Sequence, residues 1–208
     1  MNLYARRRAI ENKKDEGLPS GYQQVEYLNN NNFSSGYVEL TDIIVGDNEY
    51  SIDAEISIPS NTADFFAHGV QSSNYYCVAP YRDIGSRTLT FYPGGVNTRI
   101  DFSAGSYHRL VYSVNPATRS ISGLFDGNEF SITVNQYTTS NTPFLLFAKN
   151  YEGNWHMVGN YIRHRMTVGN ERYDLYPCVR LSDNKPGFYD VVHNMFYEGN
   201  NVTAGPSV

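Results

Sequence analysis

Residues 50–58 read Tyr-Ser-Ile-Asp-Ala-Glu-Ile-Ser-Ile, so apolar and polar side chains alternate without a break. Successive side chains of a β-strand point to opposite faces, and strict alternation therefore gives one apolar face and one polar face. The stretch predicts a half-buried strand that packs its tyrosine, alanine and isoleucines against a core. Its serines and acids are expected to face outward, as in antiparallel sheets with one solvated side.

Similar signals recur along the chain. We expect further strands at residues 64–70, 74–80, 87–92, 97–102, 107–114, 161–168 and 172–176. Residues 120–134 predict a hairpin, because Asp126-Gly127 stands between two alternating runs. The apolar run at 143–148 is expected at the centre of a sandwich. No βαβ periodicity is visible, so the sequence predicts an all-β sandwich of two antiparallel sheets, built from short strands and turns.

Composition and charge narrow the class of protein. The chain has 208 residues, which suits one sandwich domain, and 18 tyrosines, which suit both strands and binding surfaces. The net charge is −5, but residues 1–20 hold five cations and three acids, so the remainder carries −7. A general nucleic-acid binder is not expected to have such an acidic body. No apolar stretch predicts a signal peptide or a membrane span.

Residues 1–16 differ from the rest and predict a short basic helical arm before the sandwich domain at 17–208. The residues that define this arm are Leu3, Arg6, Arg7, Arg8 and Ile10. An isolated helix of this length is marginal in water, so a partner must order it. We expect the arm to serve attachment or oligomerisation.

Several motifs near the two ends of the chain point to a family. Residues 172–190 read RYDLYPCVRLSDNKPGFYD, 194–197 read NMFY and 203–206 read TAGP; near the start, 17–22 read GLPSGY and 25–28 read VEYL. This pattern resembles a family of concanavalin A-like (laminin G-like) jelly-roll domains common in tailed phages and prophages of gut bacteria. The resemblance implies a jelly-roll sandwich over residues 17–208. Asn29–Asn32 departs from the family pattern, and there we expect a polar loop.

The same resemblance implies a role. It suggests a virion protein of a tailed phage, such as a head-fibre, capsid-decoration or tail-associated module, assembled in the host cytoplasm. Capsid or tail proteins, a second copy of the chain and a host-surface glycan are the implied partners. No enzymatic activity is expected. A bacterial lectin-like domain is the alternative from the same binding class.

Aromatic and amide side chains in or beside predicted turns are the glycan-binding candidates. They are Tyr75, Tyr76, Tyr81, Arg82, Tyr151, Asn154, Trp155 and His156. Trp155 is the only tryptophan, and its polar neighbours leave two interpretations open: a core anchor or a platform on which a sugar ring stacks.

An enzymatic alternative rests on Asp53 and Glu55. Alternation puts both carboxylates on one face of the predicted strand, as in glycoside hydrolases that use paired acids. The concanavalin A-like hydrolases place a third acid in this motif, whereas Ser51 and Ser57 flank the pair here. We therefore expect a solvated outer face rather than a glycan-cleaving depolymerase.

Few residues of the sequence suit a metal site or a disulfide. Laminin G-like relatives suggest calcium, for which Asp42, Asp47 and Asn48 are the nearest oxygen donors, but calcium takes six to eight oxygens. Ordinary turn residues explain this set better, so no cofactor is expected. Cys77 and Cys178 suit reduced, buried thiols, and whether they pair is left open. At residues 182–187 we expect a turn with Gly187 at positive φ, followed by a strand from Phe188.

Overall fold

The structure is a computed structural model that describes residues 17–32, 35–57, 106–133, 141–148 and 156–208. Between residues 58 and 105 it also describes the backbone of five short strands. Every regular element in this part of the chain is a β-strand, which confirms the all-β prediction. Among the described residues there is accordingly no helix that could cross a membrane.

The described part of the chain contains eighteen strands. They are β1 (Tyr22–Gln24), β2 (Leu28–Asn30), β3 (Tyr37–Leu40), β4 (Tyr50–Ser57), β5 (Phe65–Phe66), β6 (His68–Val70), β7 (Ala79–Asp83), β8 (Thr88–Tyr92), β9 (Val96–Thr98), β10 (Tyr107–Asn115), β11 (Ser120–Phe125), β12 (Asn128–Thr133), β13 (Phe144–Leu146), β14 (Gly159–Val168), β15 (Glu171–Arg180), β16 (Lys185–Asp190), β17 (Met195–Asn200) and β18 (Thr203–Ala204).

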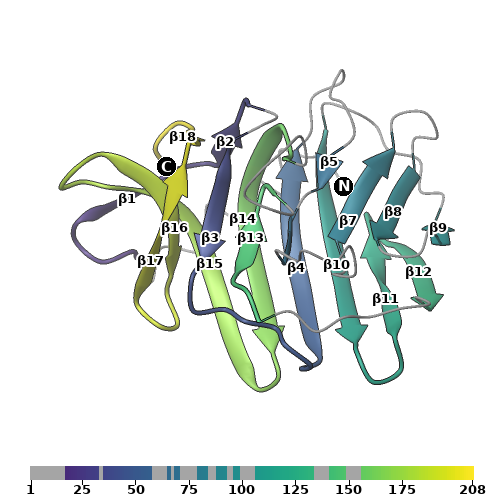
Figure 1. The fold of residues 1–208 in the computed structure, drawn as a ribbon. Helices are drawn as coiled ribbons and strands as arrows, with labels where there is room; N and C mark the ends of the chain where they lie inside the picture. Colours follow the sequence, from purple (N-terminus) through teal and green to yellow (C-terminus); the bar gives the residue numbers. More distant parts are fainter. Residues whose placement is uncertain are drawn as a thin grey trace.

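One long antiparallel sheet folds over to make most of the sandwich. Its order is β12-β11-β10-β4-β14-β15-β16-β17-β3-β13-β6, and a second sheet has the order β5-β7-β8-β9 (Figure 1). The far end of the long sheet lies over its own middle. Phe144 of β13 stands 6.0 Å from His164 of β14, and Phe147 stands 4.8 Å from Tyr161, centroid to centroid. The core lies between these two layers.

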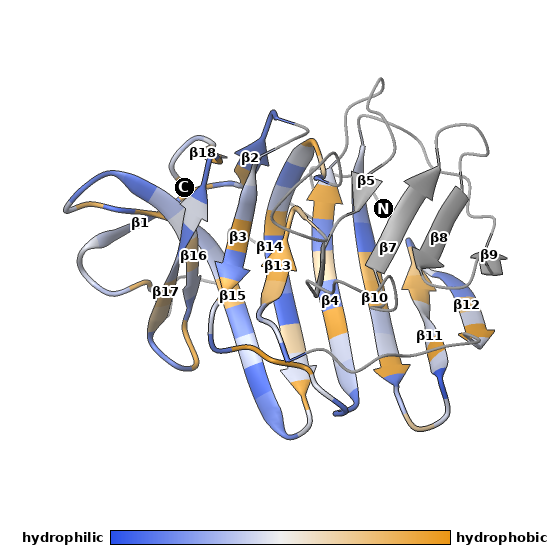
Figure 2. Ribbon diagram, in the orientation of Figure 1, coloured by the Kyte–Doolittle hydropathy of each residue, from blue (hydrophilic) through white to orange (hydrophobic). Residues whose placement is uncertain are grey.

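Strand β4 has the two faces that its sequence predicts. Ile52, Ala54 and Ile56 are at most 1% exposed and face the core. Ser51, Asp53, Glu55 and Ser57 are partly exposed on the other side. Figure 2 shows the same alternation of hydropathy along the central strands. The run that contains β13 is also confirmed as central, since Phe144 through Ala148 are fully buried.

The hairpin of β11 and β12 is confirmed together with its turn. Asp126 and Gly127 both have positive φ, 49° and 87°, which is the backbone that a two-residue hairpin loop of type I′ requires. The carboxylate of Asp126 accepts a hydrogen bond from the backbone N–H of Arg109 at 2.9 Å and contacts Nδ1 of His108 at 2.7 Å. The turn is thereby tied to β10.

The C-terminal turn differs in detail from the prediction. Asn184, not Gly187, has the positive φ, at 57°, and β16 already begins at Lys185. Gly187 lies inside the strand, where an added Cβ would stand 2.2 Å from the backbone oxygen of Tyr197. The glycine is therefore explained by close approach of β17, whereas asparagine, which tolerates the left-handed region, makes the turn.

Candidate functional site

The outer face of β4, β10 and β14 carries polar side chains in matched rows. Because antiparallel partners share a face, the strand registers place the residues of each row directly beside one another. The first row is Ser113, Ser51 and Thr167; the second is Val111, Asp53 and Arg165; the third is Arg109, Glu55 and Arg163. These three rows form the candidate site.

Asp53 is held by two arginines. Arg109 donates to both carboxylate oxygens, from Nε at 2.8 Å and from Nη2 at 2.7 Å, and Arg165 Nη1 donates at 3.1 Å. Partial burial acts to raise the pKa of Asp53, but the hydrogen bonds and positive charges of the arginines outweigh it and lower this pKa below its usual value. The carboxylate therefore stays ionised, and both of its oxygens already have donors.

A second carboxylate extends this ion network across β15. Arg163 donates to Asp174 Oδ1 at 3.2 Å from Nε and at 3.0 Å from Nη2, and also bonds the hydroxyl of Tyr176. The same guanidinium lies 4.4 Å from the centre of the Tyr176 ring. Arg165 and Arg172 each approach the Asp174 carboxylate at 3.5 Å. Four arginines of this face, Arg109, Arg163, Arg165 and Arg172, thus share the two carboxylates of Asp53 and Asp174.

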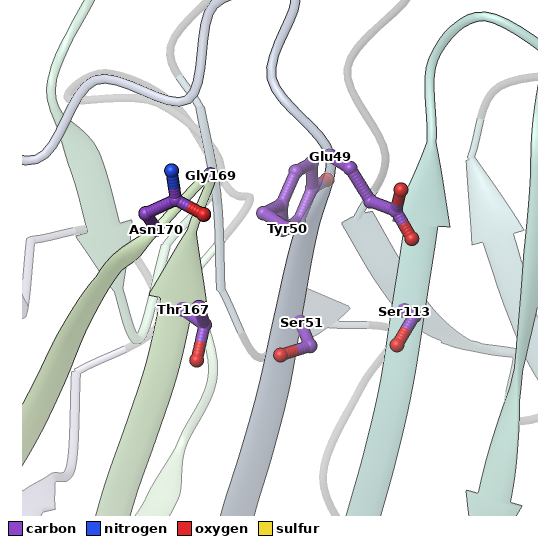
Figure 3. A pocket seen from close by; sticks show the side chains of 7 residues that line it. All are labelled: Glu49, Tyr50, Ser51, Ser113, Thr167, Gly169 and Asn170. Atoms are coloured by element: carbon purple, nitrogen blue, oxygen red, sulfur yellow. The ribbon is translucent and has the colours of Figure 1, made fainter.

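A shallow polar pocket of about 380 Å³ lies at the hydroxyl end of the face. Its lining residues are Glu49, Tyr50, Ser51, Ser113, Thr167, Gly169 and Asn170. Figure 3 shows the hydroxyls of Thr167, Ser51 and Ser113 in one line, with the Asn170 amide and the Glu49 carboxylate on either side above them. Gly169, with a φ of 57°, turns the chain here and donates its N–H to the Glu49 carbonyl at 2.9 Å.

The pocket offers hydroxyls, one amide and one carboxylate, so it can both donate and accept hydrogen bonds. This set suits a ligand rich in hydroxyl groups. In the described residues, the hydroxyls of Ser51, Ser113 and Thr167 have no hydrogen bond to the rest of the protein, so they remain available. In the sequence, Ser51 stands only where the hydrolase motif would have an acid, and neither Ser113 nor Thr167 belongs to a motif. The sequence signal that could have identified these three residues is serine or threonine at outward-facing positions of several strands.

The structure places one predicted glycan contact in the interior. His156 is fully buried and pairs with Ala148 in an isolated β-bridge; its Nδ1 lies 2.9 Å from the carbonyl oxygen of Gly36. Burial lowers the pKa of His156, although the Gly36 carbonyl opposes that shift. An imidazole packed in this way belongs to the sandwich interior and offers no surface to a sugar.

The other predicted site residues stay predictions. Tyr81 and Arg82 lie in β7, where the structure describes only the backbone. The remaining candidates lie outside the described residues: Tyr75, Tyr76, Tyr151, Asn154 and Trp155 of the glycan set, and Leu3, Arg6, Arg7, Arg8 and Ile10 of the arm.

The calcium candidates behave as turn and packing residues. Asp42 accepts a hydrogen bond from the Tyr197 hydroxyl at 2.5 Å, and the Asn48 amide donates to the Val45 carbonyl at 3.1 Å. No cluster of three His, Cys, Asp or Glu side chains suited to a metal occurs within the described ranges. Cys178 is a free, buried thiol whose pKa burial raises to about 12, and Cys77 lies outside the described residues.

Comparisons with known proteins identify the fold. No family model matches the sequence, and no curated protein matches it either. A heptameric SAP-like pentraxin from Limulus polyphemus has a TM-score of 0.60 at 10% identity, with 89% of this chain and 96% of that chain covered.

Two further solved structures are similar in fold to this chain. A predicted carbohydrate-binding protein from Bacteroides ovatus also has a TM-score of 0.60 at 10% identity, with 89% of this chain and 62% of that chain covered. The extracellular region of zebrafish Gpr126/Adgrg6 has a TM-score of 0.53 at 14% identity, with coverage of 70% and 22%. These likenesses show a jelly-roll sandwich of the concanavalin A-like kind.

Proposed function

We propose that this protein is a non-enzymatic carbohydrate-binding module. The observation that carries the proposal is the polar pocket, where three aligned hydroxyls without a hydrogen-bond partner among the described residues lie between a carboxylate and an amide. Sugars present many hydroxyls that both donate and accept, and such groups match them. The fold adds support, because one structural neighbour is itself described as a predicted carbohydrate-binding protein.

A more specific proposal is that the carbohydrate-binding module is part of a tailed-phage particle. It rests on the sequence resemblance of residues 17–28 and 172–206 to the phage family described above. In this proposal residues 1–16 attach the protein to capsid or tail proteins or join copies of it, and the sandwich binds a host-surface glycan. Assembly takes place in the cytoplasm of the host bacterium. A bacterial lectin-like domain shares the binding role without the particle.

The geometry of Asp53 argues against the glycan-cleaving alternative. Paired-acid hydrolysis needs one carboxyl group as an acid and the other as a nucleophile or base. Asp53 already accepts hydrogen bonds from Arg109 and Arg165, and the same arginines lower its pKa, so it is a poor proton donor. Its nearest acid on the strand, Glu55, lies beside Arg109 and Arg163 in the register rather than beside a third acid.

A glycan array probed with the full chain tests the binding role. The expected result is retention of at least one class of bacterial surface glycan without release of reducing ends. Release of reducing ends that Asp53→Asn with Glu55→Gln abolishes would establish the hydrolase instead. The particle role is tested separately: deletion of residues 1–16 should abolish binding to phage particles or oligomer formation while glycan retention persists.

A further inference from the structure

The hydroxyl row of the pocket continues across two more strands. Ser113 of β10 pairs with Ser122 of β11, and Ser122 pairs with Ser131 of β12. Together with Ser51 of β4 and Thr167 of β14, five hydroxyl side chains stand directly beside one another on five adjacent strands. The row ends on β15 at Arg172, the register partner of Thr167.

These hydroxyls are accessible and available for hydrogen bonding. Ser122 and Ser131 are exposed, and Ser51, Ser113 and Thr167 are partly exposed. No hydrogen bond joins any of the five hydroxyls to another residue in the part of the chain that the structure describes. Neighbouring strands lie about 4.7–4.9 Å apart, so the row offers one hydroxyl at each such step over a length of about 19 Å.

A second polar row runs beside the first. Thr133 pairs with Ser120, and Ser120 pairs with Asn115, all two positions along their strands from the first row. The Asn115 amide in turn donates to the Glu49 carboxylate at 3.4 Å. Glu49 also lines the pocket, so the second row reaches the pocket at its edge. The two rows define a polar track perpendicular to the strands.

We propose that this track binds an extended, neutral polysaccharide that crosses β12, β11, β10, β4 and β14 with about one sugar per strand. The inference rests on the carbohydrate-binding function proposed above and names its site and ligand class. The strand spacing is close to the length of one sugar ring in an extended chain, so successive sugars can each meet one hydroxyl of the row.

The charges beside the track favour a neutral ligand over an anionic one. Arg109 and Arg165 pair with Asp53, Arg163 pairs with Asp174, and no lysine or arginine is among the described residues that line the pocket. The charged group that does line the pocket is the carboxylate of Glu49, which repels uronic or sialic acids and accepts hydrogen bonds from sugar hydroxyls. Each hydroxyl contact is weak, so affinity should accumulate along the glycan.

Titration of the full chain with oligosaccharides of one to eight sugars tests the proposal. The probes are neutral gluco-, xylo- and N-acetylglucosamine oligomers, with galacturonate oligomers as the anionic series. We expect affinity for a neutral series to rise with length and to level off at about five sugars, since five strands carry the row. Amide signals of Ser51, Ser113 and Ser122 should shift in nuclear magnetic resonance spectra.

Variants of the pocket hydroxyls distinguish the proposed polysaccharide track from the broader proposal that the protein binds carbohydrate. The triple variant Ser51→Ala, Ser113→Ala and Thr167→Val should lose about tenfold or more in affinity. The matched control Ser182→Ala, in the exposed turn between β15 and β16, should bind like the wild type. If the wild type binds glycans and the triple variant binds equally well, or if only anionic glycans bind, the track is refuted while the module still binds carbohydrate. If no glycan binds at all, the proposed function itself fails.

Discussion

The two faces of strand β4 differ in what their side chains already contact. On the inner face Ile52, Ala54 and Ile56 are packed into the core with at most 1% of their surface exposed. On the outer face Asp53 is tied to two arginines, whereas Ser51 has no side-chain partner among the described residues. A single strand therefore carries packed, ion-paired and available groups in alternation.

This difference separates what determines the fold from what is left for binding. The apolar side chains lose their contact with water on folding, which is the main favourable term in stability. The charged pairs satisfy one another and add little on a partly solvated face. The hydroxyl of Ser51 retains its hydrogen-bonding capacity among the described residues, so stability and ligand binding should respond to different residues of the same strand.

The largest loss of stability is expected on the inner face. Ile56→Ala and Phe144→Ala each remove a fully buried side chain and leave a cavity, so each should lower the free energy of unfolding by about 2–5 kcal/mol. Urea denaturation followed by circular dichroism measures this. Ser57→Ala, the outward neighbour of Ile56, is the control and should change stability by less than about 0.5 kcal/mol. Equal effects at Ile56 and Ser57 would mean that the inner and outer faces are misassigned.

A pH-dependent effect should arise from His164, also on the inner face. His164 is fully buried, and burial lowers its pKa from 6.5 to about 3, although the charge of Asp53 opposes the shift. Between these two values the unfolded chain binds the proton and the folded chain does not, so acid favours unfolding. Stability should fall by about 1.4 kcal/mol per pH unit below pH 6.5 on this account. His164→Leu should remove this part of the acid sensitivity, measured as urea midpoints from pH 7 to pH 4.

His193 provides a control of opposite sign. Hydrogen bonding to Asp190 raises the pKa of His193, and Glu171 adds to the shift, while slight burial opposes it. Its contribution to stability is therefore present below the unfolded pKa of about 6.5 and is lost as the pH rises through the folded pKa. His193→Asn should destabilise the protein more at pH 5 than at pH 9. For the preceding prediction, a His164→Leu variant that remains as acid-sensitive as the wild type would show that His164 is not held neutral in the folded protein.

The ion pairs of the outer face should have a smaller effect. Asp53→Asn removes the negative charge between Arg109 and Arg165 but keeps one acceptor oxygen, so we expect a loss of about 1 kcal/mol that decreases at high salt. The control is Glu129→Gln, at an exposed position of β12, for which a change near zero is expected. Thermal unfolding at low and high salt distinguishes the two. A loss at Asp53 as large as that at Ile56 would contradict the division between the faces.

The sequence predicts the local features of this fold well. The alternation that begins at Tyr50 and the Asp126-Gly127 turn each depend on neighbours in the chain, and both are confirmed, the alternation over the described residues 50–57. The hydroxyl row was not predicted, because Ser51 meets Ser113 and Thr167 only through the register of strands distant in sequence.

The prediction for the asparagine-rich stretch at residues 29–32 is wrong for a related reason. We expected a polar loop, but Asn29 and Asn30 lie in β2, and Asn30 is fully buried. Its amide donates to the backbone carbonyls of Gly36 and Met157, at 3.1 and 2.9 Å. A buried polar side chain is stable when such distant partners satisfy it, and the local sequence does not reveal them.

The smallest effect on stability is expected at the hydroxyl row, and there it is the most informative. Ser51→Ala and Ser113→Ala remove hydroxyls that make no hydrogen bond in the described part of the chain, so the free energy of unfolding should change by less than about 0.5 kcal/mol. Each hydroxyl removed should nevertheless weaken glycan binding, because the ligand loses a hydrogen bond while the protein does not. Chemical denaturation and glycan titration of the same samples measure both quantities. A large loss of stability would assign these serines to the structure of the sheet and remove the reason to regard them as a site.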